Sequence, residues 1–387
     1  MLVMTVWNKI FISLLVISGL QCLGFQILVP ILPFYSLRFT SSEIQIGIMG
    51  ASVAFSALVT RPFSAYLADR YSRKKIIILA QAGMAVSGIG LLISRSIYHL
   101  TLVRLIQGFM FSIISTTVVT AGLTSIPKEK LGYGSGIMSM TNVGSQAIAP
   151  ALGIFIADRF GYPILFIFVI FLSVAAAVFA LFLRLKQDNL QPGNERAKFS
   201  LHDMFAKEMV GLMFLMMAFT SVTSVINNFL LLYGNTTGIS GLGYYFTIFA
   251  LVLILTRFIG GGMIDRHYYG AIVIFSAILC ISGLIVLAAA TSFLFLAITA
   301  VLIGIGYGYA NPAVQSEMIR RGGPGRVGAA TAMSYVGMDG AYMLMPVIMG
   351  AIAENVGYRE GFLAFCIPAA IAVAFVLHEW KRRKRML

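Results

Sequence analysis

Long apolar segments follow one another along almost the whole chain, and they limit its fold more than any other feature. Many reach about 20 residues, the length at which a helix rising about 1.5 Å per residue crosses the hydrocarbon core of a bilayer. The segments are continuous rather than alternating, which excludes the strands of a membrane β-barrel. Twelve can be placed, at residues 10–34, 44–68, 75–94, 98–122, 133–158, 162–183, 208–233, 241–264, 270–291, 293–316, 326–352 and 359–380. The sequence therefore predicts an all-α integral membrane protein with twelve transmembrane helices.

The composition agrees with lipid as the solvent of the exterior. Of the 387 residues, 59% are hydrophobic and 11% are charged, whereas a soluble domain carries about 25% charged residues. Such a chain has too few charges to cover a surface that faces water. The first apolar segment has no cleavage site of small residues, so we expect it to be a membrane span rather than a removable signal peptide.

The positive charge is distributed unevenly between alternate loops. Loops rich in Lys and Arg mark the cytoplasmic side of a membrane protein. One side would hold both termini with Arg70, Arg73, Arg320, Arg321 and the tail from Lys381 to Arg385. This predicts a multi-pass protein of the cell membrane with both termini in the cytoplasm. The net charge of +14 is then an orientation signal that also attracts lipid headgroups, and without a basic soluble domain we expect no nucleic-acid partner.

The reactive side chains form no pattern of an enzyme or of a metal site. Cys22, Cys280 and Cys366 lie in separate apolar segments, and the four histidines lie at loops or helix ends. An intramembrane enzyme needs a nucleophile with a base, or a metal cluster, and a membrane sensor normally adds a soluble output domain. Both remain remote alternatives to a transporter. We therefore expect no catalytic residue, metal or cofactor, and a monomer whose partners are a small molecule, protons and lipids.

An internal repeat divides the chain. Asp69-Arg70 ends the second apolar segment and Asp265-Arg266 ends the eighth, which is an offset of 196 residues. The same offset relates Pro150 to Pro346, and Gly161-Tyr162 to Gly357-Tyr358. Each half holds an even number of helices, so the two halves should run parallel, as in transporters built from paired bundles. The predicted division is an N-terminal six-helix bundle at 1–183, a polar cytoplasmic linker at 184–207 and a C-terminal six-helix bundle at 208–387.

Three motifs resemble signatures of the major facilitator superfamily. The stretch Ala65-Tyr-Leu-Ala-Asp69-Arg70-Tyr-Ser72-Arg73-Lys74 is similar to its loop signature between helices 2 and 3, with both glycines replaced by small residues. Arg104-Leu-Ile-Gln107-Gly108 is similar to its helix 4 signature. The resemblance covers essentially the whole chain and implies alternating access by two pseudo-symmetric bundles. A softened helix 5 signature, at Gly136, Ser145, Ala149, Pro150 and Gly153, resembles the twelve-helix drug:proton antiporter branch.

Charges at the cytoplasmic helix ends suggest a gate. Asp69 and Asp265 end their helices on the side where the fifth and eleventh helices begin, and a helix N-terminus attracts a carboxylate. Latches of this kind, formed in only one conformation, would bias the rocking of the two bundles. The alternative is ordinary interfacial charge that sets topology. The predicted gate consists of Asp69, Arg70, Arg73, Asp265 and Arg266.

Few ionisable residues lie within the apolar segments, and Asp339 is the carboxylate nearest the middle of one. Charges inside the hydrocarbon region are costly and often functional. Burial disfavours the charged form of a carboxyl group, so we predict that Asp339 couples proton movement to transport or binds substrate. The alternative is a hydrogen-bonded core aspartate. Arg104 would be its counterpart in the other half, and the resemblance implies a coupling role for it. For Arg61 and Arg257 we favour a structural role.

Polar and aromatic residues recur at helical spacing within the apolar segments. Because an amide that faces lipid is unfavourable, these stripes should face inward, although helix–helix hydrogen bonding is an equally good explanation for any one amide. The resemblance implies that helices 1, 4, 7 and 10 line a central cavity. The predicted substrate cavity contains Gln21, Gln26, Phe111, Asn142, Gln146, Asn227, Asn228, Tyr307, Asn311, Gln315, Tyr335 and Tyr342.

Two transport functions follow from these features. The first is a secondary active transporter that exports a small, drug-like organic molecule in exchange for protons. The second differs in its cargo: Arg61, Arg104, Arg257 and Asp339 carry a net charge of +2 when the aspartate is ionised, which favours an anionic or zwitterionic metabolite such as a metallophore or organic acid. The sequence leaves the choice between them open.

Overall fold

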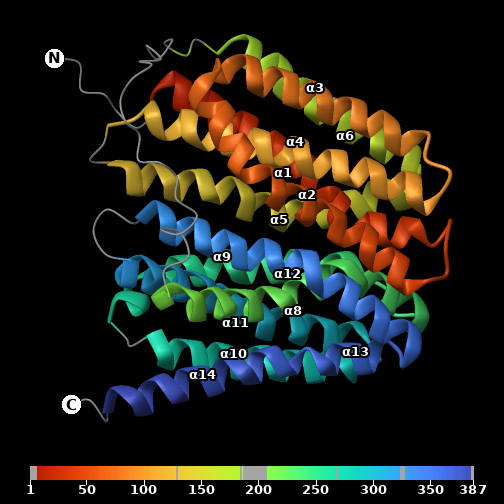
Figure 1. Ribbon diagram of the computed structural model, residues 1–387. Helices are drawn as coiled ribbons and strands as arrows, with labels where there is room; N and C mark the ends of the chain where they lie inside the picture. The colour runs from red at the N-terminus through yellow and green to blue at the C-terminus, as the bar shows by residue number, and fades with distance from the viewer. Residues whose placement is uncertain are drawn as a thin grey trace. The chain divides into compact units, whose positions relative to one another are not determined.

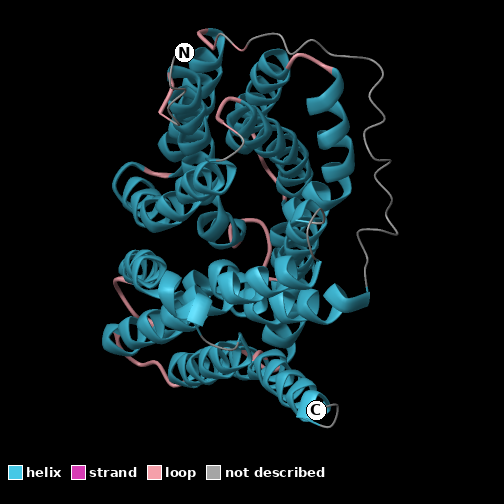
Figure 2. Ribbon diagram, turned by 90° about the vertical axis from the view of Figure 1, so that its left-hand side faces the viewer, coloured by secondary structure: helices cyan, strands magenta, loops and turns pink. Residues whose placement is uncertain are grey.

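The computed structural model describes residues 7–127, 130–183, 185, 207–266, 269–322 and 327–384. Within these ranges the side chains at 62, 65, 69, 131–133, 135–136, 207–208, 257–266, 327–329, 332 and 382–384 are not described. The predicted linker at 184–207 therefore lies almost wholly outside the described residues. Every regular element in the described ranges is a helix (Figure 2).

The described helices follow the predicted apolar segments closely. Ten of them contain stretches long and apolar enough to span a membrane, an eleventh such stretch, Tyr358–Lys381, runs through the last two helices, and Leu242–Thr256 adds a shorter apolar stretch. This confirms the all-α membrane fold class. The helices are α1 (Lys9–Ser36), α2 (Glu43–Arg70), α3 (Arg73–Leu92), α4 (Ile97–Thr124), α5 (Leu131–Phe160), α6 (Tyr162–Leu181), α8 (Lys207–Thr237), α9 (Leu242–Arg266), α10 (Tyr269–Ala288), α11 (Phe293–Gly322), α12 (Val327–Asn355), α13 (Tyr358–Ala364) and α14 (Cys366–Lys384).

The last predicted segment differs from expectation, because it is broken into α13 and α14. The break lies at Phe365, whose backbone caps α13 by donating to the carbonyl oxygen of Phe362 at 3.2 Å. Pro368 follows three residues later and has no N–H to donate to the carbonyl of Ala364. The missing hydrogen bond explains why the helix restarts here instead of running through.

The chain forms two compact units. The first contains residues 1–40 and 52–194, and the second contains residues 41–51 and 195–387. In the first unit α3 packs against α4 and α6, and α1 packs against α5 and α6; in the second, α10 packs on α11 and α12 on α8 (Figure 1). Helix α2 is divided between the units: its first turns pack with the second unit and the remainder with the first.

The internal repeat has a visible structural basis at two turns. Gly161 precedes α6 with a φ of +84°, and Gly357 precedes α13 with a φ of +110°. A positive φ is readily adopted only by glycine. Both turns are followed by a tyrosine at the first helical position. The matching Gly-Tyr pairs seen in the sequence are therefore a repeated helix-to-helix turn.

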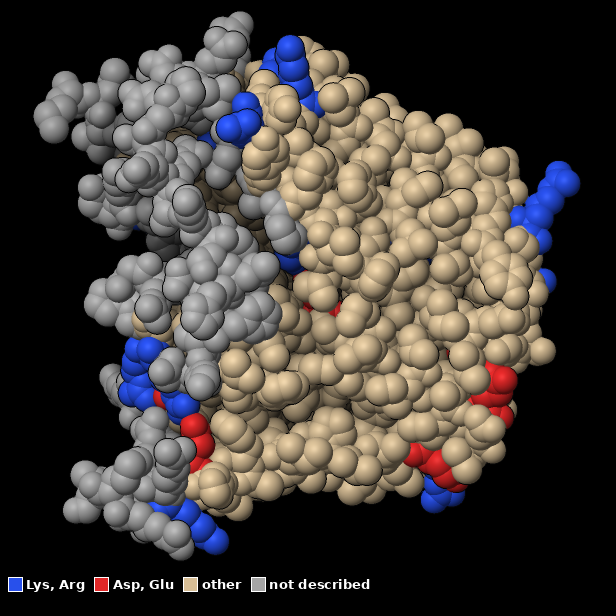
Figure 3. All heavy atoms as spheres, viewed as in Figure 1, with Lys and Arg blue, Asp and Glu red and all other residues tan. Residues whose placement is uncertain are grey.

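The outward faces of the helices are apolar. Leu79 and Val86 of α3 and Phe171 of α6 are among many large hydrophobic side chains that are exposed. On the face drawn in Figure 3, charged side chains gather towards the two ends of the helices and leave a broad, almost uncharged band between them. In water this surface would be unfavourable, whereas lipid is its natural surrounding.

Candidate functional site

A buried cation and a pair of aromatic rings form the polar centre of the first unit. Arg104 of α4 is 3% exposed, and its Nη1 donates a hydrogen bond to Oε1 of Gln107 at 3.1 Å. Its guanidinium carbon lies 5.6 Å from the ring centre of Phe25 on α1. The Phe25 ring stacks on Phe111, with ring centres 4.0 Å apart. The spacing of Arg104, Gln107 and Phe111 places all three on one face of α4.

The predicted amides of α1 and α5 lie in the same unit. Gln146 donates to the Oδ1 of Asn142 at 3.0 Å, and Asn142 approaches the sulfur of Cys22 on α1 at 4.0 Å. Gln21 is 4% exposed, and its amide nitrogen has no hydrogen-bond partner among the described residues. Gln26 is partly buried. Polar groups thus follow α1, α4 and α5 of this unit.

The second unit holds a separate polar and aromatic cluster. Asn227 of α8 donates to the phenol oxygen of Tyr342 on α12 at 2.9 Å. On α11, Asn311 donates to the phenol oxygen of Tyr307 at 3.2 Å. The phenol of Tyr342 also interacts electrostatically with Tyr307 and with Asp339. Helices α8, α11 and α12 thus carry the polar side chains of this cluster, and Tyr342 is the member that interacts with Asp339.

The remaining predicted cavity residues have varied surroundings. Asn228 is 4% exposed and donates to the carbonyl oxygen of Ser224 in its own helix at 2.8 Å. Gln315 is partly buried, and Tyr335, one turn before Asp339, is 43% exposed. Asp339 itself is partly buried.

The predicted cytoplasmic gate is described only in part. Arg73 donates from Nε to the carbonyl oxygen of Ala68 at 3.1 Å and from Nη1 to the hydroxyl of Thr124 at 2.8 Å, so it ties the end of α2 to the end of α4. Arg70 lies over the ring of Tyr66. The side chains of Asp69, Asp265 and Arg266 lie outside the described residues.

A polar contact at the opposite end of α2 was not predicted from the sequence. The second carboxylate oxygen of Glu354, near the end of α12, accepts hydrogen bonds from the Ser42 hydroxyl at 2.7 Å and the Ile44 N–H at 3.0 Å. It thereby caps the free N–H groups at the start of α2. Beside it the Tyr358 hydroxyl donates to Glu43. These residues all belong to the second unit and fasten the first turn of α2 to α12 and α13.

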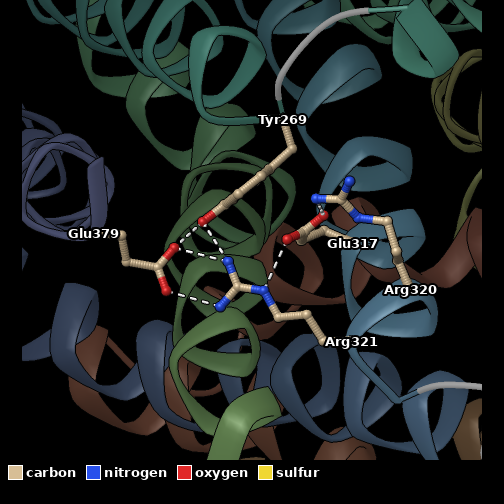
Figure 4. Close-up of polar contacts among 5 residues, drawn as sticks. All are labelled: Tyr269, Glu317, Arg320, Arg321 and Glu379. Carbon is tan, nitrogen blue, oxygen red and sulfur yellow. Dashed lines mark hydrogen bonds and ion pairs between the residues drawn. The ribbon is translucent and has the colours of Figure 1, made fainter. Parts of the chain in front are cut away.

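A network of charges at the end of α11 was also missed (Figure 4). Arg321 contacts Glu317 at 2.8 Å through Nε, and Glu379 of α14 at 2.7 and 2.8 Å through its two terminal nitrogens. Its Nη2 also donates to the hydroxyl of Tyr269 on α10 at 2.8 Å, and Tyr269 itself hydrogen-bonds to Glu379. Arg320 contacts Glu317 from the solvent side at 2.5 Å. The Glu317–Arg321 pair has the i, i+4 spacing that a sequence can reveal, whereas Glu379 gives no such signal.

Comparison with known proteins agrees with this architecture. The family model described as Major Facilitator Superfamily matches residues 14–333 and 212–386. The chain is 24% identical to Multidrug resistance protein MdtG of Proteus mirabilis over 376 residues, which cover 92% of this chain and 91% of that protein. It is 22% identical to the protein of the same name in Citrobacter koseri, covering 94% of this chain and 92% of that protein.

Solved structures share the fold. The nucleoside transporter NupG has a TM-score of 0.76 at 13% identity, covering 97% of this chain and 100% of that one. A bacterial homolog of the human lysosomal transporter Spinster has a TM-score of 0.78 at 14% identity, covering 96% of both chains. Apolar helices in two units, the repeated turns, the signature motifs and these matches together lead to one conclusion. The chain belongs to the major facilitator superfamily and is a membrane transporter, similar to drug:proton antiporters, rather than an enzyme.

Proposed function

We propose that this protein exports a small organic molecule in exchange for protons by alternating access. The observation that carries this proposal is the position of Asp339. It lies 12 residues after the start of α12 and 16 before its end, at the middle of a helix long enough to cross the membrane. It interacts electrostatically with the phenol of Tyr342, which accepts a hydrogen bond from Asn227 of α8. A carboxyl group at such depth can exchange a proton when water reaches it.

The relatives support export as the direction of transport. Those compared above are called multidrug resistance proteins, and the match covers more than nine tenths of each of them. We propose the same direction for this chain, with both termini in the cytoplasm as the distribution of Lys and Arg indicates. The protein would work as a monomer.

In the proposed cycle, Asp339 changes its protonation state between the two orientations of the cavity. When the cavity faces outward, the carboxylate takes up a proton, and the amides around it release the cargo. When the cavity faces the cytoplasm, the proton leaves and the ionised carboxylate restores the geometry that binds cargo. Arg104 is the proposed counterpart of Asp339 in charge. Asp69, Arg70, Arg73, Asp265 and Arg266 form the proposed cytoplasmic gate.

Asp339→Asn is expected to abolish proton coupling, because the amide has nearly the shape of the carboxyl but no proton to exchange. In everted vesicles that carry a pH gradient, adding cargo from a substrate screen should release protons through the parent protein. The variant should give at least a tenfold smaller proton movement, measured with a lumenal pH dye. The matched control is Asp158→Asn, which removes the same charge from an exposed position near the end of α5. Proton flux that is unchanged in Asp339→Asn would overturn the coupling role.

A further inference from the structure

The first unit has a buried positive charge, and its own helices carry no acidic side chain near it. The acidic residues on α1 to α6, apart from Glu43 in the part of α2 that packs with the second unit, are Asp69 and Asp158. Asp69 is the penultimate residue of α2, and Asp158 lies two residues before the end of α5. Arg104 lies seven residues into α4, about 10 Å from its start. The interior of this bundle therefore holds a cation and no acidic residue.

The guanidinium of Arg104 is incompletely satisfied. Its described contacts are the hydrogen bond to Gln107 and the approach to the Phe25 ring. Its Nε–H is buried and has no hydrogen-bond partner among the described residues, and the same holds for the amide nitrogen of Gln107. Donors from two side chains, one of them charged, are thus available at one place on α4.

A buried guanidinium such as that of Arg104 needs an anion close to it. Arginine remains protonated in proteins, so it cannot avoid the cost of burial by losing its charge. A buried charge is tolerated when it is paired and hydrogen-bonded. Arg321 of the same chain illustrates the rule: it is 17% exposed, more accessible than Arg104, and contacts two carboxylates. Arg104 has the greater need for an anion and contacts none among the described residues.

We propose that Arg104, together with the amide of Gln107, binds the carboxylate of an organic anion that this protein transports. A guanidinium offers donors in a planar fork that matches a carboxylate, and the Gln107 amide nitrogen adds a third donor. The stacked rings of Phe25 and Phe111 provide an apolar wall for the rest of the molecule. The cargo class is therefore a small monocarboxylate with an apolar body. This inference rests on the proposed function in one respect, that the bound anion is the cargo.

Binding can be tested on the purified full-length protein in detergent without any proton gradient. The probes are two matched pairs, phenylacetate with phenylacetamide and hexanoate with hexanamide, which differ only in whether the head group is charged. The readout is the concentration of each probe that gives a half-maximal rise of the thermal unfolding midpoint. At least one carboxylate should bind at least tenfold more tightly than its amide.

Two variants and one control connect this preference to the site. Arg104→Gln should remove the difference between carboxylate and amide, and Gln107→Met, which keeps the guanidinium, should weaken carboxylate binding by at least about tenfold, in line with a lost hydrogen bond to a charged group. Arg95→Gln removes the same charge from an exposed position and should change nothing. If Arg104→Gln does not fold, Arg104→Lys and Gln107→Met still test the site, because a lysine lacks the planar fork and should bind carboxylates at least threefold more weakly.

Three results would overturn the proposal: no stabilisation by either carboxylate, equal stabilisation by acid and amide, or carboxylate binding that is unaffected in the Arg104 variants. The outcome is separable from that of the proposed function. Arg104-dependent carboxylate binding together with unchanged proton flux in Asp339→Asn would remove the coupling and leave this site. Intact proton-coupled export without carboxylate binding would remove the carboxylate site and leave the proposed coupling.

Discussion

One methyl group added at Gly47, in the variant Gly47→Ala, is expected to reduce transport by at least about fivefold. A β-carbon at Gly47 would lie 2.9 Å from the carbonyl carbon of Pro346 and closer still to its oxygen. Backbone atoms cannot rotate away, so the start of α2 must separate from α12. Overpacking of this kind costs about 1–3 kcal/mol, and a bias of that size shifts a conformational equilibrium by about 5- to 150-fold.

The control for this variant adds the same group where space is open. A β-carbon at Gly144 of α5 would meet nothing within 4 Å, so Gly144→Ala should retain the transport rate. Initial rates in vesicles, normalised to the amount of folded protein, provide the comparison. Gly350→Ala should behave like Gly47→Ala, because its β-carbon would lie 2.9 Å from the carbonyl carbon of Glu43. Equal rates in Gly47→Ala and Gly144→Ala would show that the close approach of α2 and α12 has no role in the cycle.

The second large effect concerns stability, at Arg321. Arg321→Met should destabilise the second unit by about 1–3 kcal/mol, the usual cost of leaving hydrogen-bonded polar groups unsatisfied in a partly buried site. The substitution removes both Arg321 hydrogen bonds from the carboxylate of Glu379, which is 21% exposed, and it removes the link from α11 to α10 and α14. The expected measurement is a clear fall in the thermal unfolding midpoint of the purified protein.

The neighbouring arginine supplies a matched control. Arg320 also contacts Glu317, but its side chain is 65% exposed, and exposed ion pairs contribute little. Arg320→Met should therefore leave the midpoint almost unchanged. The double variant Arg321→Met with Glu379→Met should recover part of the loss, since replacing both partners by apolar groups is often nearly neutral. Similar midpoints for the two single arginine variants would contradict the interpretation.

The sequence predicted the helical elements because lipid imposes a simple rule on them. A span must be long, apolar and helical, and each of these properties can be read locally. The repeat at an offset of 196 residues likewise predicted equivalent positions, and the paired turns at Gly161 and Gly357 agree with it. The interruption at Phe365 was not predicted, although Pro368 is a sequence signal for it.

The packing of the candidate sites was harder to predict, because it depends on partners far apart in the chain. Arg320 and Arg321 look equivalent as markers of the cytoplasmic side, yet only Arg321 points towards Glu379, which lies 58 residues away. The contact of Glu354 with the start of α2 spans 312 residues to Ser42. Stripes of amides indicated which residues avoid lipid, but not that Arg104 turns towards Phe25 and Gln107. The orientation of these side chains is determined by residues that are distant in the sequence rather than by local spacing.

Helix α2 makes two close backbone contacts with different helices at nearby positions along its length. Close to its start, Gly47 lies against the backbone of α12, and six residues later the backbone of Val53 lies against Gly108 of α4, where a β-carbon would be 3.0 Å from the Val53 carbonyl carbon. These two contacts are about 9 Å apart along an unbroken helix. A β-carbon at Gly47 or at Gly108 would collide with backbone, so this stretch of α2 accepts no added side chain at either contact without a backbone shift.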